Sequence, residues 1–160
     1  MPAVTNILDE IQNRLENISE MNGYYTFVKS IKRSMMTPFT PYDLPAINLW
    51  ATGVLNNQIS YKIDERTINL FIEYHSKTRE EPFIDVAEKL VSDVVTAINR
   101  STTNPAKDDT ESFNLGGIVK SCLMNEYNYE IIEGQTPYCG VLISFSIVYN
   151  CKTNNMEDYL

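Results

Sequence analysis

Few residues in the sequence have a type and spacing that could perform a reaction. His75 is the only histidine, so a multi-histidine zinc site is excluded, and no pair of thiols lies near it in the sequence. A serine–histidine–aspartate arrangement would need His75 as its base, but no Gly-x-Ser-x-Gly turn is present to expose a nucleophile. Gly-x-Gly-x-x-Gly and P-loop motifs are also absent, and Leu115-Gly116-Gly117 is interpreted as a turn or a helix break. We therefore expect His75 to be an ordinary imidazole, exposed or half-buried on the outer face of a strand.

Acidic residues could bind Mg²⁺ for the hydrolysis of nucleic acid, because Mg²⁺ prefers carboxylate ligands. Four carboxylates lie at or beside the ends of predicted strands: Asp43, Asp64, Glu65 and Glu73. Such a site usually also needs a nearby lysine, and the nearest ones, Lys62 and Lys77, show no informative spacing. Acidic residues at strand ends are mostly solvated turn residues. The sequence thus predicts no enzyme, no catalytic residue, no metal ligand and no cofactor, with a Mg²⁺-dependent cytoplasmic enzyme as the less favoured alternative.

Large apolar side chains in polar surroundings are better candidates for function. Residues 34–43 break every periodic pattern, since two prolines remove backbone donors and fix φ, so this segment is predicted to be a long loop. It carries Met35, Met36, Phe39 and Tyr42, and adaptable methionines and rigid aromatics are enriched at protein interfaces. The loop either binds a partner or folds back over one end of the core.

Three tyrosines extend this predicted interface. Tyr127 and Tyr129 alternate with polar residues in a predicted strand, which is typical either of a hydrated sheet face or of a subunit contact. Tyr159 belongs to a polar segment, 152–160, that is predicted to be a flexible tail, and a second long loop is predicted at 101–114. The complete candidate interface is Met35, Met36, Phe39, Tyr42, Tyr127, Tyr129 and Tyr159.

Two segments have the periodicity of amphipathic helices. The first covers 5–20, with Thr5 or Asn6 as its cap and Asn22-Gly23 as its stop. The second begins at Pro82, which suits the first helical position, and continues to about residue 100. These helices must cover a sheet.

Alternating and β-branched segments predict the strands of that sheet. Within 67–74, apolar side chains fall on one side, while Glu73 and His75 fall on the other, which fits a strand with one buried face. The residues from Gly53 to Asn57 are interpreted as a turn, and Asp64-Glu65 as a break between strands. The other predicted strands are 24–33, 44–52, 58–63, 122–132 and 138–151, the last two forming a hairpin.

Length and composition limit the class of protein. The 160 residues, 43% of them hydrophobic, suffice for one core, so a single domain spanning 1–160 is predicted. We expect no membrane span and no secretory signal, because no long apolar run is visible. Cys122, Cys139 and Cys151 lack metal-binding spacing and are predicted to be buried thiols. The order of elements predicts an α+β fold: a mainly antiparallel sheet with two helices packed on one face.

The net charge of −8 argues against a dedicated DNA-binding protein, because phosphate binding needs clustered lysines and arginines. Lys29, Lys32 and Arg33 form the only basic cluster, and the last 56 residues carry 3 basic and 8 acidic groups. An acidic surface along which DNA slides without adhering is compatible with this balance.

Several phrases of the sequence, in their order, carry a resemblance to a known family. After the first amphipathic segment come Asp43-Leu44-Pro45-Ala46-Ile47-Asn48-Leu49-Trp50, the alternating 68–74, the helical 86–98 and the alternating 141–149. This arrangement resembles the tail terminator (tail completion) proteins of long-tailed bacteriophages, the lambda type among them, over nearly the whole chain. The chain departs from the shorter members in its loops at 34–43 and 101–114 and in its tail.

The resemblance implies a non-enzymatic structural protein. Family members form a hexameric ring of identical copies on the head-proximal end of the tail tube, stop tube polymerisation and provide the surface that joins the head. The implied partners are other copies of the chain, the tail tube protein and a head-completion or connector protein, with DNA passing through the lumen unbound and no membrane. The implied location is the head-proximal end of the virion tail, after assembly in the host cytoplasm. Another neck or tail component, such as a head–tail connector or tube protein, is the alternative.

Overall fold

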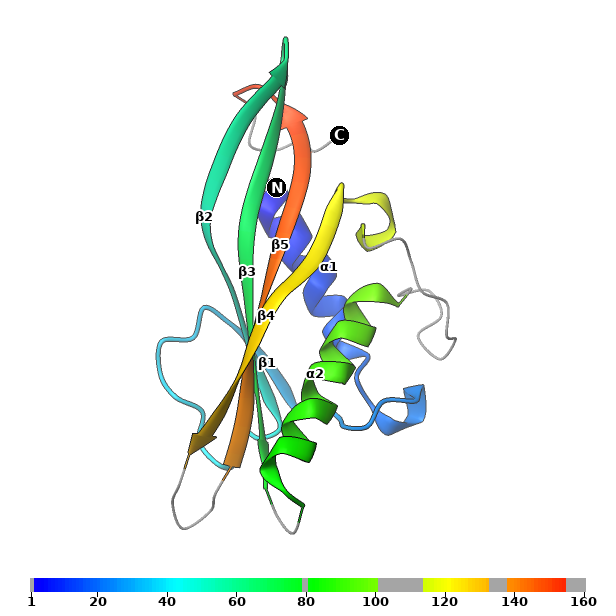
Figure 1. The fold of residues 1–160 in the computed structure, drawn as a ribbon, viewed down its shortest axis with the longest axis vertical. Helices are drawn as coiled ribbons and strands as arrows, with labels where there is room; N and C mark the ends of the chain where they lie inside the picture. The colour runs from blue at the N-terminus through cyan, green and yellow to red at the C-terminus, as the bar shows by residue number, and fades with distance from the viewer. Residues whose placement is uncertain (1, 79–80, 101–113, 133–137, 155–160) are drawn as a thin grey trace.

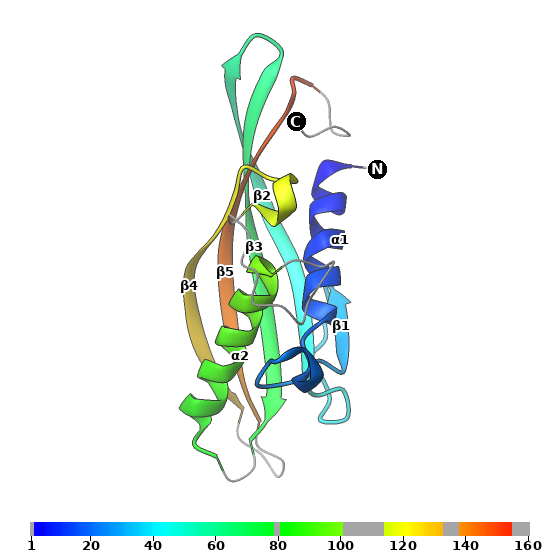
Figure 2. The same ribbon diagram turned by 90° about the vertical axis from the view of Figure 1, so that its right-hand side faces the viewer.

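The computed structural model describes residues 2–78, 81–100, 114–132 and 138–154. A five-stranded sheet has the order β1-β2-β3-β5-β4 and is formed by β1 (Ser30–Arg33), β2 (Ala46–Ser60), β3 (Ile63–Lys77), β4 (Ser121–Ile132) and β5 (Tyr138–Lys152). Only the β1–β2 pair is parallel in this sheet, and the other three pairs are antiparallel. Helices α1 (Ala3–Glu16) and α2 (Phe83–Asn99) lie on one face of it, as Figures 1 and 2 show. The predicted α+β fold is confirmed.

The core lies between this face and the two helices. Ile68, Leu70, Ile72 and Tyr74 of β3 point toward the helices and are buried, as the alternation predicts. On the helix side, Ile7, Ile11 and Leu15 of α1 and Leu90 and Val94 of α2 recur at helical spacing and are fully buried. The three cysteines are buried and unbridged, as predicted.

The first helix is shifted from its prediction. It begins at Ala3 and ends at Glu16, and Pro2 precedes it, with the Asn6 N–H donating to the Pro2 carbonyl at 3.1 Å. A cap by Thr5 or Asn6 is therefore wrong. A short 3₁₀ turn, η1 (Glu20–Asn22), follows and ends at Gly23, whose φ of +83° is the left-handed conformation that glycine favours.

The predicted strand at 24–33 forms only at its end, as β1. The residues before it bond instead to Asp93, which is buried on α2 and accepts from the backbone N–H groups of Tyr25 at 3.0 Å and Thr26 at 2.8 Å. The Tyr74 hydroxyl donates to the Phe27 carbonyl at 2.9 Å. These side-chain acceptors and donors take the backbone groups that a longer strand would have used.

The predicted turn at 53–57 and the break at Asp64-Glu65 are both wrong. Strands β2 and β3 stay paired from Ala46–His75 to Ser60–Ile63, and the chain reverses only at Tyr61 and Lys62. Gly53 lies at an irregularity in this ladder, between Thr52 and Val54, so the glycine marks a bulge within one long strand. The resulting hairpin projects beyond the helices (Figures 1 and 2).

A second short 3₁₀ turn, η2 (Leu115–Gly117), precedes β4, in keeping with the expected turn at this position. Among the described residues, no helix is both long and apolar enough to cross a membrane.

Candidate functional site

The tip of the β2–β3 hairpin exposes apolar side chains. Every residue from 52 to 62 is exposed, and among them Leu55 and Tyr61 have exposed fractions of 72% and 84%. Val54 and Ile59 add two further exposed apolar side chains, each about half exposed. Sequence reasoning missed this surface, because the glycine and asparagines of the segment favour a turn when the partner strand is unknown.

Both edges of the sheet leave backbone groups open for pairing. β1 covers β2 only from Ala46 to Leu49, so the described residues offer no strand partner to the outer edge of β2 beyond that point. At the opposite edge, β4 pairs only with β5 and carries the exposed side chains of Leu123 and Ile131. Unpaired strand edges of this kind are templates for contact with another chain.

The loop at 34–43 divides into a buried and an exposed part. Phe39 is only 8% exposed and forms a small second cluster with Leu44 and Ala46, against which Met35 packs. Met36, by contrast, is 95% exposed, and Tyr42 is also exposed. The loop thus folds back over one end of the sheet through Phe39, while Met36 and Tyr42 stay available for a partner.

Trp50 and Met36 line a hollow on the face of the sheet away from the helices. Its volume is about 360 Å³, and Met35, Asn48 and Glu73 lie around it. Trp50 stacks on Phe71 of the next strand, with ring centroids 5.6 Å apart. This aromatic pair forms an apolar surface on the outer face of the sheet, beside the loop.

Tyr127 and Tyr129 lie on the helix side of β4. The Tyr127 hydroxyl donates to Glu88 of α2 at 3.1 Å, and Tyr129 donates to the same carboxylate oxygen. The hydrogen bond to Glu88 raises the pKa of Tyr129 to about 12. The pair therefore ties the edge strand to α2, with Tyr129 still partly exposed at the rim. Tyr159, most of the 101–114 loop and most of the 152–160 tail lie outside the described residues.

The four carboxylates considered for Mg²⁺ do not converge. Asp43 accepts from the N–H and hydroxyl of Thr40, and these bonds hold the pKa of its carboxyl below the ordinary range. Asp64 is buried and accepts from Asn56 and Thr153 near the hairpin tip, and Glu65 pairs with Lys120 at 2.6 Å. Glu73 lies nine residues beyond Asp64 along β3, and at the rise of a strand this separates the two residues by about 30 Å. These four carboxylates therefore do not form a shared Mg²⁺ site in the described part of the chain.

His75 occupies a different environment from the one predicted. It lies on the expected outer face, in register with Gly140 of β5, but it is only 3% exposed. Phe39 and Tyr138 cover its ring edge-on, at centroid distances of 6.1 and 5.8 Å. The expectation of an exposed or half-buried imidazole is wrong, because the folded-back loop covers this end of the outer face.

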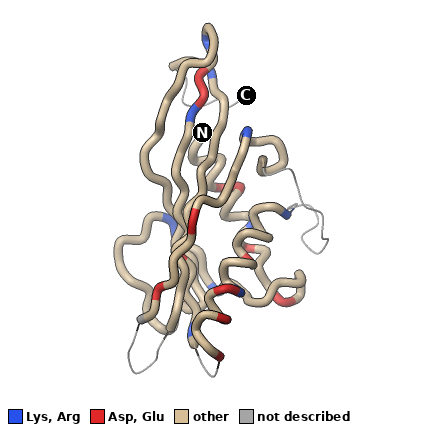
Figure 3. Tube along the Cα trace, in the orientation of Figure 1, with Lys and Arg blue, Asp and Glu red and all other residues tan. Residues whose placement is uncertain are grey.

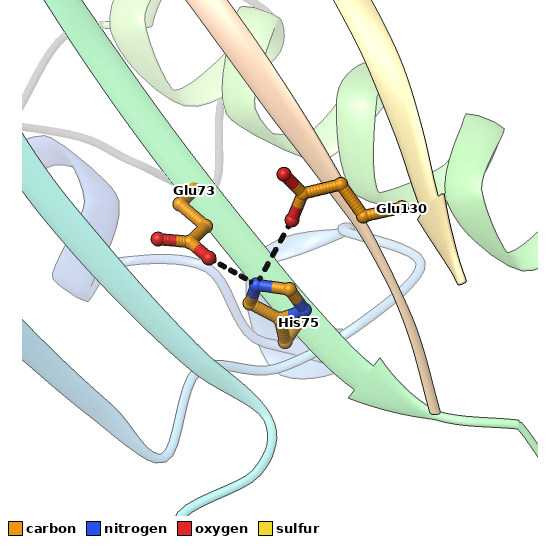
Figure 4. Close-up of side chains that lie close together, drawn as sticks. All are labelled: Glu73, His75 and Glu130. Atoms are coloured by element: carbon orange, nitrogen blue, oxygen red, sulfur yellow. Dashed lines mark hydrogen bonds and ion pairs between the residues drawn. The ribbon is translucent and has the colours of Figure 1, made fainter. Parts of the chain in front are cut away.

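The His75 ring faces two carboxylates (Figure 4). Its Nε2 atom lies 2.6 Å from Glu73 Oε1 and 3.3 Å from Glu130 Oε2. The hydrogen bond with His75 lowers the pKa of Glu73, whereas burial raises the pKa of Glu130. Sequence reasoning missed Glu130, since only the register of β4 on β5 brings it opposite Gly140 and thus near His75.

The predicted basic cluster does not form a free cationic patch. The Lys29 ammonium donates to the Tyr42 carbonyl, and Arg33 forms an ion pair with Asp9. Figure 3 shows the lysine and arginine positions spread along the molecule, interspersed with acidic ones. Within the described residues, this dispersion, together with the net charge of −8, leaves no surface suited to tight phosphate binding.

A scan against models of known protein families finds no match to this sequence, and a search of curated proteins finds no relative. The fold defines a single-sheet α+β protein, and such a fold does not by itself imply a function.

Proposed function

We propose that this protein is a structural subunit of a bacteriophage tail, of the tail terminator type, whose copies close a ring over the head-proximal end of the tail tube. The observation that carries the proposal is the projecting β2–β3 hairpin with its exposed apolar tip. The resemblance in the sequence supports the same assignment.

The apolar tip has a physical cost in a lone monomer. Large apolar side chains gathered on a projecting element mark an interaction surface, because leaving them in water forgoes the free energy of burial. Full burial of Leu55, which is 72% exposed, would contribute roughly 1.5 kcal/mol. Val54, Ile59 and Tyr61 would add comparable amounts, so the hairpin tip alone could supply several kcal/mol to an interface.

The positions of the hairpin and of β4 favour a head-to-tail arrangement. The open edge of β2 and the edge strand β4 lie on opposite sides of the sheet, so one copy can present its hairpin to the β4 side of the next. Contacts between two different surfaces are heterologous, and they close into a ring when the rotation between copies divides a full turn. We propose six copies, as the resemblance implies.

The charge of the protein fits a ring through which DNA passes. The chain carries 21 acidic against 13 basic residues, and the basic ones are dispersed. A lumen of this composition would repel the phosphate backbone weakly and leave DNA free to move. The ring would contact the tube protein on one side and a head-completion protein on the other, in the virion and, before that, in the host cytoplasm.

The proposal is tested by measuring assembly, alone and on purified tail tubes, with light scattering and negative-stain microscopy. We expect the wild-type protein to form rings, either free or only at one end of the tubes. The variant Leu55→Lys plus Tyr61→Lys should remain an 18.3 kDa monomer with an unchanged circular dichroism spectrum.

A matched control is Met21→Lys plus Tyr25→Lys, which replaces two other exposed apolar residues away from the hairpin and shifts the charge equally. This control should assemble like the wild type. A wild-type protein that stays monomeric both alone and with tail tubes would contradict the ring. Normal assembly of the Leu55/Tyr61 variant would show that the hairpin is not the contact.

A further inference from the structure

Three side chains with metal-ligand atoms converge on the outer face of the sheet. Glu73 and His75 point outward from β3, and Glu130 reaches the same place from β4, as Figure 4 shows. In the part of the chain that the structure describes, this is the only group of three or more His, Cys, Asp or Glu residues whose ligand atoms all lie within 4.8 Å of one another. We propose that Glu73, His75 and Glu130 form a binding site for a divalent transition-metal ion of the zinc class.

The distances between the ligand atoms fit such an ion after a small adjustment. A zinc ion with bonds of about 2.0–2.2 Å in tetrahedral geometry holds its ligand atoms about 3.4 Å apart. The distance from His75 Nε2 to Glu130 Oε2 is 3.3 Å, and that from Nε2 to Glu73 Oε1 is 2.6 Å. Glu73 is half-buried beside the hollow of about 360 Å³, so its carboxylate has room to move outward by the required amount.

The donor set selects a class of metal. One imidazole nitrogen with two carboxylate oxygens suits zinc and its first-row neighbours, whereas Mg²⁺ and Ca²⁺ prefer oxygen ligands alone. Three protein ligands leave a fourth position for water. The ion would therefore be held at one edge of the hollow.

The charges at the site also favour a cation. The two carboxylates approach one buried imidazole, and the charged groups that act on Glu130 among the described residues are His75 and Glu73. A neutral imidazole leaves two negative charges here, while an imidazolium compensates one of them. A divalent ion compensates both, and it binds Nε2 in competition with a proton.

The fold prepares the imidazole for this role. His75, Gly140 and Glu130 stand in one row across β3, β5 and β4, so no side chain on β5 separates Glu130 from the ring. A Cβ atom built on Gly140 would lie 2.3 Å from His75 Nδ1, so the ring fills the space that a side chain would need. Phe39 and Tyr138 pack edge-on against the ring and fix its orientation. The ligand that must be placed most accurately is thus held rigidly, while the two carboxylates can adjust.

A bound ion would cross-link two strands that are not neighbours. Glu73 and His75 belong to β3, and Glu130 belongs to the edge strand β4, with β5 between them. Coordination would therefore hold the far end of β4 on the sheet. This role is independent of ring formation, because all three ligands come from one chain.

The test is titration of the metal-free purified protein with Zn²⁺ by calorimetry at neutral pH. We expect one ion per chain and a raised melting temperature. Glu130→Gln should weaken Zn²⁺ binding at least about 10-fold, the loss that even an outer partner of a metal ligand causes. Cobalt replacing zinc should give the visible absorption of a coordinated ion, and Glu130→Gln should abolish it.

The matched control is Glu126→Gln, which removes an exposed carboxylate from the same strand and should bind Zn²⁺ like the wild type. His75→Gln, checked for folding by circular dichroism, should lose binding altogether. Absence of binding by the folded wild-type protein, or equal binding by the wild type and Glu130→Gln, would overturn the proposal. In that case the three residues form a hydrogen-bonded cluster only.

Discussion

Replacing Gly140 by alanine tests the packing around His75 directly. Gly140 lies on β5 opposite His75, and its φ is not in the left-handed region, so alanine would meet no backbone strain there. The added Cβ would lie 2.3 Å from His75 Nδ1, 2.7 Å from Cε1 and 2.8 Å from the Tyr74 carbonyl oxygen. All three distances are shorter than van der Waals contact allows, so the ring or the strand must move.

The sign of the change in the free energy of unfolding shows whether the added methyl group of Gly140→Ala is accommodated or strikes the His75 ring. Without these contacts, glycine to alanine in a strand would stabilise the protein by about 0.5–1 kcal/mol, because the unfolded chain loses freedom. Overpacking opposes this by about 1–3 kcal/mol, and an imidazole displaced from Glu73 loses a charge-assisted hydrogen bond of about 1.5–3 kcal/mol. We expect Gly140→Ala to lower the free energy of unfolding by about 3 kcal/mol, which corresponds to a melting temperature about 6–12 °C lower for a chain of this length.

The assay is urea unfolding of the metal-free protein, followed by circular dichroism and by the fluorescence of Trp50, the single tryptophan. The slope of the transition should stay unchanged while the midpoint falls. In a His75→Ala background, Gly140→Ala should be less destabilising, because the ring that it strikes is gone and only the Tyr74 carbonyl remains. A Gly140→Ala variant as stable as the wild type, or the same loss with and without the ring, would refute this account of the packing.

Two further predictions concern carboxylates that accept hydrogen bonds inside the fold, those of Asp93 and Glu73. Asp93→Ala should lower the free energy of unfolding by about 3 kcal/mol in urea, because the N–H groups of Tyr25 and Thr26 lose their acceptor, and Asp93→Asn, which keeps one oxygen, should lose less. The His75 hydrogen bond lowers the pKa of Glu73 below its ordinary value of 4.5, so its contribution to stability is present above that pH and is lost as the pH falls through the lower, folded value. Unfolding midpoints measured from neutral pH downward should therefore show the wild type losing its advantage over Glu73→Gln below about pH 4.5, and a constant difference would contradict the coupling.

Several elements could be predicted because their signals are local. The helical spacing of apolar residues in α2 and the alternation from Ile68 to Tyr74 in β3 each show which face is buried, whatever the partner. The same alternation correctly placed Glu73 and His75 on the opposite face. Chain length and element order then suffice for a single α+β domain, since two amphipathic helices need one sheet face to cover.

The interface and ring predictions rest on residues whose roles only assembly experiments can test, but the structure changes which of them are available. Phe39 is buried, whereas Met36 and Tyr42 are exposed. A local sequence cannot distinguish these, because methionine and phenylalanine have similar hydrophobicity and the loop has no period. Whether a side chain of the loop is buried depends on whether it contacts Leu44 and Ala46 at the end of the sheet.

The sequence by itself determined the two helices, the alternating strands, the faces that those strands present and the acidic balance of the chain, because each depends on residues close together in the chain or on a simple count. Tertiary structure alone decided that Gly53 sits in a bulge of one long hairpin, that the 24–28 segment bonds to Asp93, and that Glu130 meets His75 across Gly140. The physical reason is that these features depend on strand register and on the covering of a sheet face by a distant loop. Register couples residues as far apart as His75 and Glu130, and no local pattern records that coupling.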